Sequence, residues 1–397
     1  MKKNIMTYLE KLNKYILIIL LLVWPWQTRY FLCRGVSEYT SSSIYVSDLL
    51  VLILFLLFVF RVKQLLEAKG IINYFLFSLI PVALLAIAQF SLNTSWSTKW
   101  LGLAKHDPLT LGQVVIELPN GERLLRAYGS FDHPNILGGV LAVALWLLIF
   151  LPNSFSSRIK IFLVLLFSTG LFFSFSRAAW FGFLVGLIIY GGLNFKEVKN
   201  VLARYVENKK TRAKPFQGKK LPESVELMFV VFLCTLMLSF IYRDLLFNRL
   251  SFEGRLEYKS VNERVSYYHD AIDIFSHVPF LGTGYGNYVP TLMRLKPGLQ
   301  TWEYQPVHNV FVLILVELGL VRFVMLFITI WWLKLALQRR SGLIMTPLLS
   351  GFLVSIFIMM LFDHWWWSLH VGLLLIGLLG LIGVKLMNNN KQNICIK

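Results

Sequence analysis

The chain has 397 residues, of which 56% are hydrophobic and only 15% charged, and its mean hydropathy is +0.63. A soluble protein this apolar could not cover its surface with polar side chains, so this composition excludes the soluble globular classes. Apolar runs of nearly 20 residues recur along the chain, and about 20 helical residues span the core of a bilayer. We therefore predict an all-α polytopic membrane protein that forms a single integral-membrane domain.

The formal net charge of +18 lies mainly in short loops between the apolar runs. Lys and Arg in such loops set membrane topology and attract anionic headgroups, and this placement argues against a nucleic-acid partner. The three cysteines, Cys33, Cys234 and Cys395, are scattered. Their spacing fits neither a disulfide framework nor a zinc site.

About ten apolar runs are predicted to cross the membrane as helices. The first follows a basic start and has no small-residue cleavage site, so we expect an uncleaved span and not a signal peptide. The expected spans are Leu12–Trp26, Ser47–Phe60, Ile71–Phe90, Ile136–Leu151, Ile159–Phe175, Ala178–Leu193, Val225–Tyr242, His308–Leu337, Leu343–Phe362 and Trp365–Leu386.

Loop charges predict the orientation of these spans. The loop 195–224 is the most basic: the stretch Phe195–Glu226 holds nine Lys/Arg against four Asp/Glu, so it is expected in the cytoplasm. Alternation then places both termini inside and two long loops, 91–133 and 243–307, outside. These outer loops are balanced, with four and seven residues of each sign respectively.

This topology requires the apolar stretch His308–Leu337 to cross the membrane once. Thirty residues of straight helix would be about 45 Å long, more than the core needs. We therefore expect a strongly tilted helix, or a break near Glu317-Leu318-Gly319.

Both outer loops are predicted to contain local structure. In the first, two β-rich runs flank Asn120-Gly121, which indicates a hairpin. In the second, an amphipathic helix is expected over Asn262–Ser276, lying on the membrane surface or against the bundle. Its apolar residues recur at steps of three and four: Val265, Tyr268, Ile272 and Phe275.

A glycine-rich run follows that helix, with Gly282, Gly284 and Gly286 at alternate positions. This spacing matches neither standard phosphate-binding loop, and the run lacks the strand–loop–helix context that such loops need. We interpret it as a compact turn that positions Tyr285 and Tyr288.

Three arginines near the outer ends of the spans are candidate phosphate ligands: Arg177, Arg264 and Arg126. A guanidinium suits phosphate because its planar fork donates two parallel hydrogen bonds. Each position also has an ordinary interpretation, since Arg177 could snorkel to the interface and Arg264 could lie on the solvated face of its helix. Position alone does not separate these alternatives.

The pair His308-Asn309 opens a span at its outer end. The positive end of the helix dipole favours a neutral imidazole at such a place, and a neutral imidazole can act as a general base. An interfacial histidine without a role is the alternative. Glu317 lies nine residues further on, roughly 13 Å along a regular helix, so it should instead support the helix break or pair with an arginine. His133 and Asn135 flank a proline that suits the first turn of a helix, where Asn can cap.

Four motifs, taken in order, resemble the O-antigen ligase and polymerase family of bacterial membrane glycosyltransferases. They are RAYGSFDHPNILGG, SFSRAAW, NERVSYYHDAIDIFSHVPFLGTGYGNY and HNVFVLILVELGL, and together they lie between Leu124 and Leu320. By this resemblance Arg177 and Arg264 match the family's arginines, His308 matches its histidine, and Arg126 is a looser match. The family's usual small residue after the E-x-G turn is here Arg322, following Val321.

The resemblance implies a type C glycosyltransferase architecture and a polyprenyl-diphosphate-linked glycan as donor at the outer leaflet of the inner membrane. The arginines would stabilise the leaving diphosphate and His308 would deprotonate the acceptor, with inversion at the anomeric carbon. Asn309, Glu317, His133, Asn135 and Tyr268 would support the site. No cofactor and no metal are expected, and the acceptor could be a glycan, a lipid or a protein. The alternatives are a transporter or flippase for a small anion or glycolipid, and a membrane scaffold.

Overall fold

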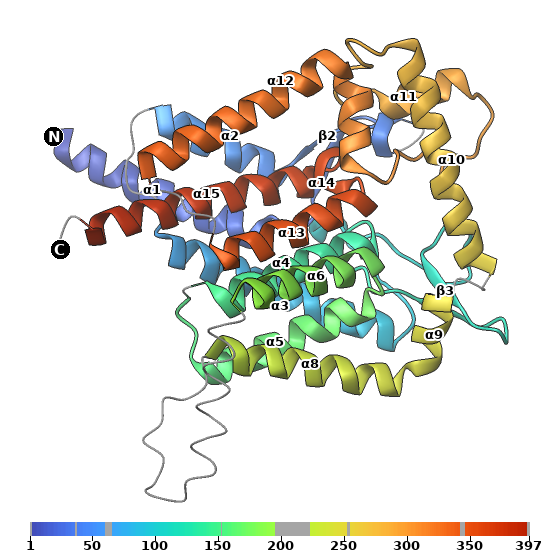
Figure 1. The fold of residues 1–397 in the computed structure, drawn as a ribbon, viewed down its shortest axis with the longest axis horizontal. Helices are drawn as coiled ribbons and strands as arrows, with labels where there is room; N and C mark the ends of the chain where they lie inside the picture. Colours follow the sequence, from blue (N-terminus) through green and yellow to red (C-terminus); the bar gives the residue numbers. More distant parts are fainter. Residues whose placement is uncertain are drawn as a thin grey trace, which may run out of the picture.

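The structure is a computed structural model that describes residues 2–35, 38–59, 66–151, 153–194, 223–251, 255–341 and 346–394. It is mostly helical (Figure 1). The long helices run side by side along the longest dimension of the molecule, and α1 begins and α15 ends at the same end of this bundle (Figure 1). They are α1 (Lys2–Val23), α2 (Val46–Val59), α3 (Ala68–Ser91), α4 (Pro134–Phe150), α5 (Ser157–Phe173), α6 (Arg177–Leu193), α8 (Glu223–Ile241), α12 (Val310–Ser341), α13 (Pro347–Phe362) and α15 (His370–Ile394).

The remaining elements gather at the opposite end of the bundle (Figure 1). They include four strands that form two antiparallel pairs. One pair forms around Asn120-Gly121, with Val115 opposite Leu125. These elements are β1 (Arg29–Cys33), β2 (Ser42–Tyr45), β3 (Val115–Glu117), β4 (Arg123–Leu125), α9 (Arg243–Ser251), α10 (Arg255–His277), α11 (Tyr288–Leu295) and α14 (Trp365–Ser368), with single 3₁₀ turns at Glu38–Thr40 and Lys99–Leu101.

Among the described residues, three helices are long and apolar enough to cross a membrane: Ala68–Ser91, Glu223–Ile241 and Val310–Ala336. Four shorter apolar helices accompany them, at Pro134–Phe150, Arg177–Leu193, Pro347–Phe362 and His370–Leu386. The chain is therefore a multi-pass membrane protein. Ten crossings, the outward placement of loops 91–133 and 243–307, and the cytoplasmic termini remain predictions.

Some predicted boundaries differ from those in the structure or lie beyond the described residues. The last predicted span was expected to begin at Trp365, but α14 ends at Ser368 and α15 begins separately at His370. Most of the basic loop 195–224 lies outside the described residues, as do the end of the predicted span Ser47–Phe60 and the start of Leu343–Phe362.

The helix α4 lies at the centre of the bundle, because every residue from Pro134 to Ile149 is buried. It contacts α3, α5, α6, α8 and α13. Helices α6 and α13 approach each other most closely through small residues: a Cβ added at Gly186 would lie 2.6 Å from the Gly351 carbonyl oxygen, and one at Gly182 would lie 2.7 Å from that of Ser355. Such pairs of small residues four apart let membrane helices pack backbone to backbone. The central frame that carries the functional residues is thus tightly packed.

The helix α12 is broken where the sequence predicted a break. Gly319 has φ 69° and ψ 169°, a conformation that is accessible essentially only to glycine. The groups freed by the break bond to the segment 279–284: Leu320 N–H donates to the Pro279 carbonyl at 2.8 Å and Gly284 N–H to the Glu317 carbonyl at 2.8 Å. Because a membrane offers no water to such groups, this insertion is what makes the break tolerable.

The glycine-rich run forms the expected compact turn, with positive φ at Gly282, Gly284 and Gly286. Gly282 lies directly against Gly319, since a Cβ on Gly282 would lie 2.4 Å from the Gly319 nitrogen. Arg322, which replaces the family's small residue, donates from NH1 to the Leu281 carbonyl at 2.9 Å. The substitution therefore ties the turn to the second half of α12.

The packed face of α10 is not the predicted apolar stripe. The helix runs over Arg255–His277 and buries Tyr267, Ala271 and Ile274, whereas Val265 and Ile272 of the predicted stripe are 52% and 65% exposed. The periodicity holds for both faces, and the face that packs is the one next to α11 and α12. The exposed stripe leaves the membrane-surface placement as a prediction.

Candidate functional site

At the start of α12, the neighbouring residues His308 and Asn309 have different roles. The Asn309 Oδ1 accepts hydrogen bonds from the backbone N–H of Phe311 at 2.9 Å and of Val312 at 3.1 Å, so Asn309 caps the helix. The Asn309 Nδ2 donates to the hydroxyl of Tyr268 at 3.2 Å, which brings two of the predicted supporting residues together. This cap fixes the backbone that carries His308.

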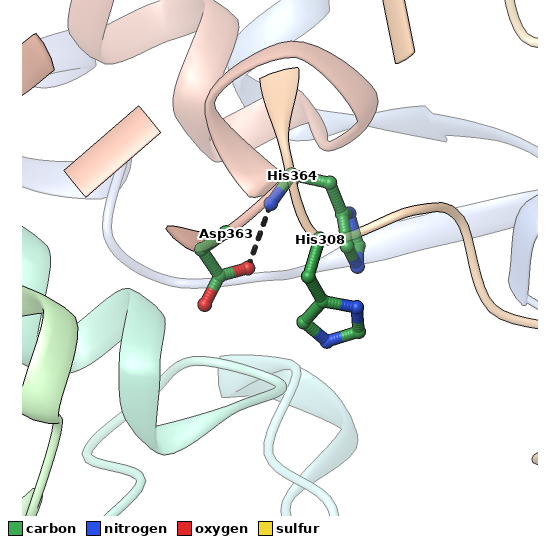
Figure 2. Close-up of side chains that lie close together, drawn as sticks. All are labelled: His308, Asp363 and His364. Atoms are coloured by element: carbon green, nitrogen blue, oxygen red, sulfur yellow. Dashed lines mark hydrogen bonds between the residues drawn. The ribbon is translucent and has the colours of Figure 1, made fainter. Parts of the chain in front are cut away.

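The His308 ring lies beside the turn between α13 and α14. His308 and His364 meet edge to face, with ring centroids 4.9 Å apart, and the Tyr267 ring stacks on His308 at 5.4 Å. The ligand atoms of His308, His364 and Asp363 all lie within 4.8 Å of one another. In Figure 2 both imidazoles and the carboxylate lie close together between the loop before α12 and the α13–α14 turn.

Asp363 is the anchor of this cluster and is 5% exposed. Its Oδ1 accepts the backbone N–H of His364 at 2.9 Å (Figure 2), and its Oδ2 accepts the Asn135 side-chain amide at 2.7 Å. Asn135 in turn accepts from the Arg126 NH2 group at 2.7 Å. A hydrogen-bonded chain thus links the turn after α13, the start of α4 and the loop 91–133.

The start of α4 has a proline in its first turn, as the sequence predicted, but its N-cap is His133 and not an Asn. Pro134 occupies the first turn, and the His133 Nδ1 accepts from the backbone N–H of Asn135 at 3.0 Å. Since Nδ1 is an acceptor here, His133 is a neutral imidazole with its proton on Nε2. Burial, and then the positive charge of Arg126, lower the pKa of His133 to about 3, although Asp363 raises it.

The electrostatics of the cluster favour neutral histidines beside an ionised carboxylate. Burial, and then Arg264, lower the pKa of His308, while Asp363 and the nearby Pro306 carbonyl raise it. Burial and His308 lower the pKa of His364 to about 3. Burial raises the pKa of Asp363, but the neighbouring histidines and the Asn135 hydrogen bond outweigh it, so the pKa lies below its ordinary value. His308 is therefore able to accept a proton near neutral pH.

The Arg126 side chain is buried, and its hydrogen bonds are to other groups of the protein. It is 3% exposed, and its Nε donates to the Ser174 carbonyl at 2.7 Å while its NH2 holds Asn135. Burial, reinforced by the charge of Arg249, lowers the pKa of this guanidinium well below its usual range. Its contacts are those of a residue that positions Asn135 and the turn Ser174–Arg177, called the SFSR turn below.

Arg177 begins α6 directly after that turn, and Ser176 caps the helix by accepting from the Ala179 N–H at 3.3 Å. Its NH1 forms an ion pair with Glu257 at 3.1 Å and donates to the Arg249 carbonyl at 3.3 Å. The guanidinium is partly exposed and lies at the positive end of the α6 dipole. Both features suit a group that binds an anion.

Arg264 lies on α10 and is partly exposed. Its positive charge acts on the pKa of His308, so it belongs to the same electrostatic environment as the histidine. Glu317 is apart from the cluster: it is 3% exposed and accepts a hydrogen bond from the Trp367 indole at 2.8 Å. It therefore supports the helix break through Trp367 and pairs with no arginine among the described residues.

Two imidazoles and one carboxylate, those of His308, His364 and Asp363, could hold a divalent cation. Two of the ligands already have partners in the protein. Both oxygens of Asp363 accept hydrogen bonds, and the His364 Nδ1 lies 2.6 Å from the Ser368 hydroxyl. The Nδ1 of His308 has no hydrogen-bond partner among the described residues, and the three side chains form the donor set that a metal would use.

The sequence interpretation missed four members of this region: Asp363, His364, Arg249 and Glu257. Asp363-His364 precedes three tryptophans, a position that is typical of an aromatic belt at the membrane interface. The signal available was an acidic residue at the end of an apolar run, which is costly in a membrane unless it has a function. Arg249 and Glu257 lie in an ordinary charged loop, where the sequence gives no such signal.

Comparison with known proteins adds one finding. A search of curated proteins gives no match. Residues 161–327 match the family model described as O-antigen ligase, a segment that includes Arg177, Arg249, Glu257, Arg264 and His308. This match confirms the resemblance to the O-antigen ligase and polymerase family that the motifs indicated, over three of the four motifs.

Proposed function

We propose that this protein is a membrane glycosyltransferase that moves a glycan from a polyprenyl-diphosphate donor to an acceptor hydroxyl at the outer leaflet. The observation that carries the proposal is the position of His308. Its ring lies beside the ionised Asp363, within the electrostatic influence of Arg264. A general base next to cationic groups matches what transfer from a lipid diphosphate requires.

In the proposed reaction a ring nitrogen of His308 takes the proton of the acceptor hydroxyl. The hydroxyl oxygen attacks the anomeric carbon as the bond between that carbon and the phosphate oxygen breaks. Attack from the opposite face inverts the anomeric centre, and the polyprenyl diphosphate leaves with the bonding electron pair. Asp363 stabilises the imidazolium that forms, in the manner of a carboxylate paired with a catalytic histidine.

Arg177 and Arg264 are proposed to bind the donor diphosphate and to stabilise the charge that develops on it. Arg126 is proposed to act one step away, because its hydrogen bonds hold the SFSR turn and Asn135. The leaving group is already activated, so the proposal needs neither a nucleotide nor a metal. The acceptor class, whether glycan, lipid or protein, is left to experiment.

The break in α12 is the observation that would favour a transporter, since transporters often bind ions at discontinuous helices. Here backbone groups freed around Gly319 bond to the segment 279–284, and the Glu317 carboxylate is held by Trp367. Backbone groups used in this way are not available to coordinate an ion. We therefore favour chemistry at the outer end of the bundle.

The test is reconstituted transfer with a synthetic undecaprenyl-diphosphate oligosaccharide and a panel of acceptors. His308→Ala should reduce transfer by a factor of about 10²–10⁴, the usual contribution of a general base. His269→Ala is the matched control, because His269 is exposed on α10. Transfer by His308→Ala at the wild-type rate would rule out the role of His308. Movement of the donor across liposomes without glycan transfer would instead support a flippase.

A further inference from the structure

A second charged cluster lies next to Arg177 and joins α6, α9 and α10. The Oε1 of Glu257 accepts a hydrogen bond from the Arg249 NH1 group, and its Oε2 lies 3.1 Å from the Arg177 NH1 group. Glu257 is 4% exposed and Arg249 8% exposed. One buried carboxylate thus bridges two guanidinium groups from different helices.

The two ion pairs of Glu257 are unequal. The contact with Arg249 is a hydrogen bond, whereas the Oε2 that faces Arg177 has no hydrogen bond of good geometry among the described residues. Arg177 is also the more exposed guanidinium, with 19% of its side chain accessible against 9% for Arg249. The arrangement therefore holds Arg249 firmly and leaves Arg177 more easily redirected toward another anion.

Arg249 itself is only partly satisfied by the protein. Its NH1 binds Glu257 and its Nε donates to the Phe175 carbonyl at 3.4 Å. Within the described chain, its NH2 makes no hydrogen bond. Phe175 belongs to the SFSR turn and has φ 46°, so a turn in an uncommon conformation lies directly against the guanidinium.

Positive charge also accumulates here. Arg126, Arg177 and Arg249 lie close enough for the charges of the other two to lower the pKa of Arg126, and Glu257 is the acid that opposes them. Buried like charges repel strongly unless an anion lies among them. A ligand carrying two or more negative charges would complement this excess of positive charge, because three guanidinium groups lie near a single carboxylate.

We propose that Arg249 is a further anion-binding residue of the donor site, and that Glu257 is a positioning residue that holds Arg249 and Arg177 side by side. The inference rests on the proposed function, because the anion is the diphosphate of the lipid-linked donor. It goes further by assigning a third guanidinium and by predicting a preference for diphosphate over monophosphate. A larger cationic set gains more from the more highly charged ligand.

The experiment measures direct binding of undecaprenyl diphosphate and undecaprenyl monophosphate to the full-length protein in lipid nanodiscs. The variants are Arg249→Gln and Arg249→Lys, with Arg243→Gln as the control from the same helix, whose side chain is 74% exposed. Arg249→Gln should raise the Kd for the diphosphate about tenfold, as expected for one charge-assisted contact. It should raise the Kd for the monophosphate less, so that the preference between the two lipids falls. Arg249→Lys should keep part of the affinity for the diphosphate and part of the preference for it over the monophosphate.

A purely structural Arg249 would lower thermal stability and leave the preference between the two lipids unchanged, which would overturn the inference. Arg249→Lys keeps the buried charge, so it provides a folded variant if Arg249→Gln does not fold. Arg177→Gln and Arg264→Gln separate the two proposals. If these weaken diphosphate binding and the Arg249 variants do not, only this inference fails. If wild-type protein binds neither lipid, the proposed function fails as well.

Glu257→Gln tests the positioning role, with Glu263→Gln on α10 as the matched control. Without the carboxylate, Arg177 and Arg249 repel each other and lose their shared anchor. We expect weaker diphosphate binding, although the variant gains one unit of positive charge. Tighter binding would mean that Glu257 merely competes with the donor, and it would overturn the positioning role.

Discussion

The carboxylate of Asp363 and the imidazole of His308 come together although 55 positions separate them in the chain, with their polar atoms within 4.8 Å. The meeting depends on the cap at Asn309 on one side and on the Asn135–Asp363 hydrogen bond on the other. Arg126 extends the same hydrogen-bonded chain to the loop 91–133. The proposed base is thus oriented by four separate parts of the sequence.

The pH dependence of transfer should report the charge around His308. The protonated imidazole cannot accept a proton, so transfer should fall as the pH decreases through the pKa of His308. Burial and Arg264 lower that pKa below its ordinary value of 6.5, which places the acid limb of the profile below pH 6.5. The measurement is kcat/KM against pH for the reconstituted enzyme.

Two variants should shift that acid limb in opposite directions. Asp363 raises the pKa of His308 and Arg264 lowers it. Asp363→Asn should therefore move the limb to lower pH, and Arg264→Gln should move it to higher pH, whatever their effects on the maximum rate. Limbs that stay in place in both variants would show that another group controls the profile.

Arg126 and Arg264 should differ in what their loss affects. Arg126→Gln removes a buried guanidinium that holds Ser174 and Asn135, and each buried acceptor left without its hydrogen bond costs about 1–3 kcal/mol. Arg264 is partly exposed, so Arg264→Gln should leave the thermal unfolding temperature nearly unchanged while weakening donor binding. Equal stability of the two variants would contradict a structural role for Arg126. Thermal unfolding in detergent, paired with donor binding, makes the comparison.

Local features were accessible from the sequence because a few neighbouring residues determine them. The excess length of His308–Leu337 and a glycine after Glu317 predicted the break at Gly319, and His308-Asn309 predicted the helix start. The partners of the site were not accessible, because Asp363 meets His308 only through the packing of α13 against α12 and α4.

The helix α10 shows that hydrophobic periodicity can predict a helix without predicting which of its faces is packed. Its spacing predicted an amphipathic helix, but two stripes satisfy the same spacing, and the sequence cannot say which one meets α11 and α12. Tyr267, Ala271 and Ile274 are buried there, and Ile272 of the predicted stripe is exposed. The pairing of Arg249 with Glu257 depends on how α9 meets α10, which no local pattern shows, so it could not be predicted either.

The contact between Gly319 and Gly282 should be intolerant of any side chain. At Gly319 the φ of 69° and ψ of 169° disfavour every other residue, and an added Cβ would lie 2.4 Å from the Gly282 nitrogen. Gly319→Ala should lower the free energy of unfolding by about 1–3 kcal/mol from strain and overpacking. Gly380→Ala in α15 is the control, because its Cβ would meet no atom within 4 Å. Thermal unfolding of the two variants decides the matter, and equal stability would contradict the close approach.

Metal removal tests whether the cluster of His308, Asp363 and His364 acts through its own protons or through an ion. Asp363 is already held by Asn135 and by the His364 backbone, and a neutral His308 is a base in its own right. Transfer should therefore be unchanged after dialysis against EDTA and after re-addition of magnesium, manganese or zinc. A loss with EDTA that one of these ions restores would assign the three side chains to a metal. In that case His364→Ala, which leaves the proposed base intact, should lower the affinity for the restoring ion, and this second measurement would distinguish a bound metal from a nonspecific effect of the chelator.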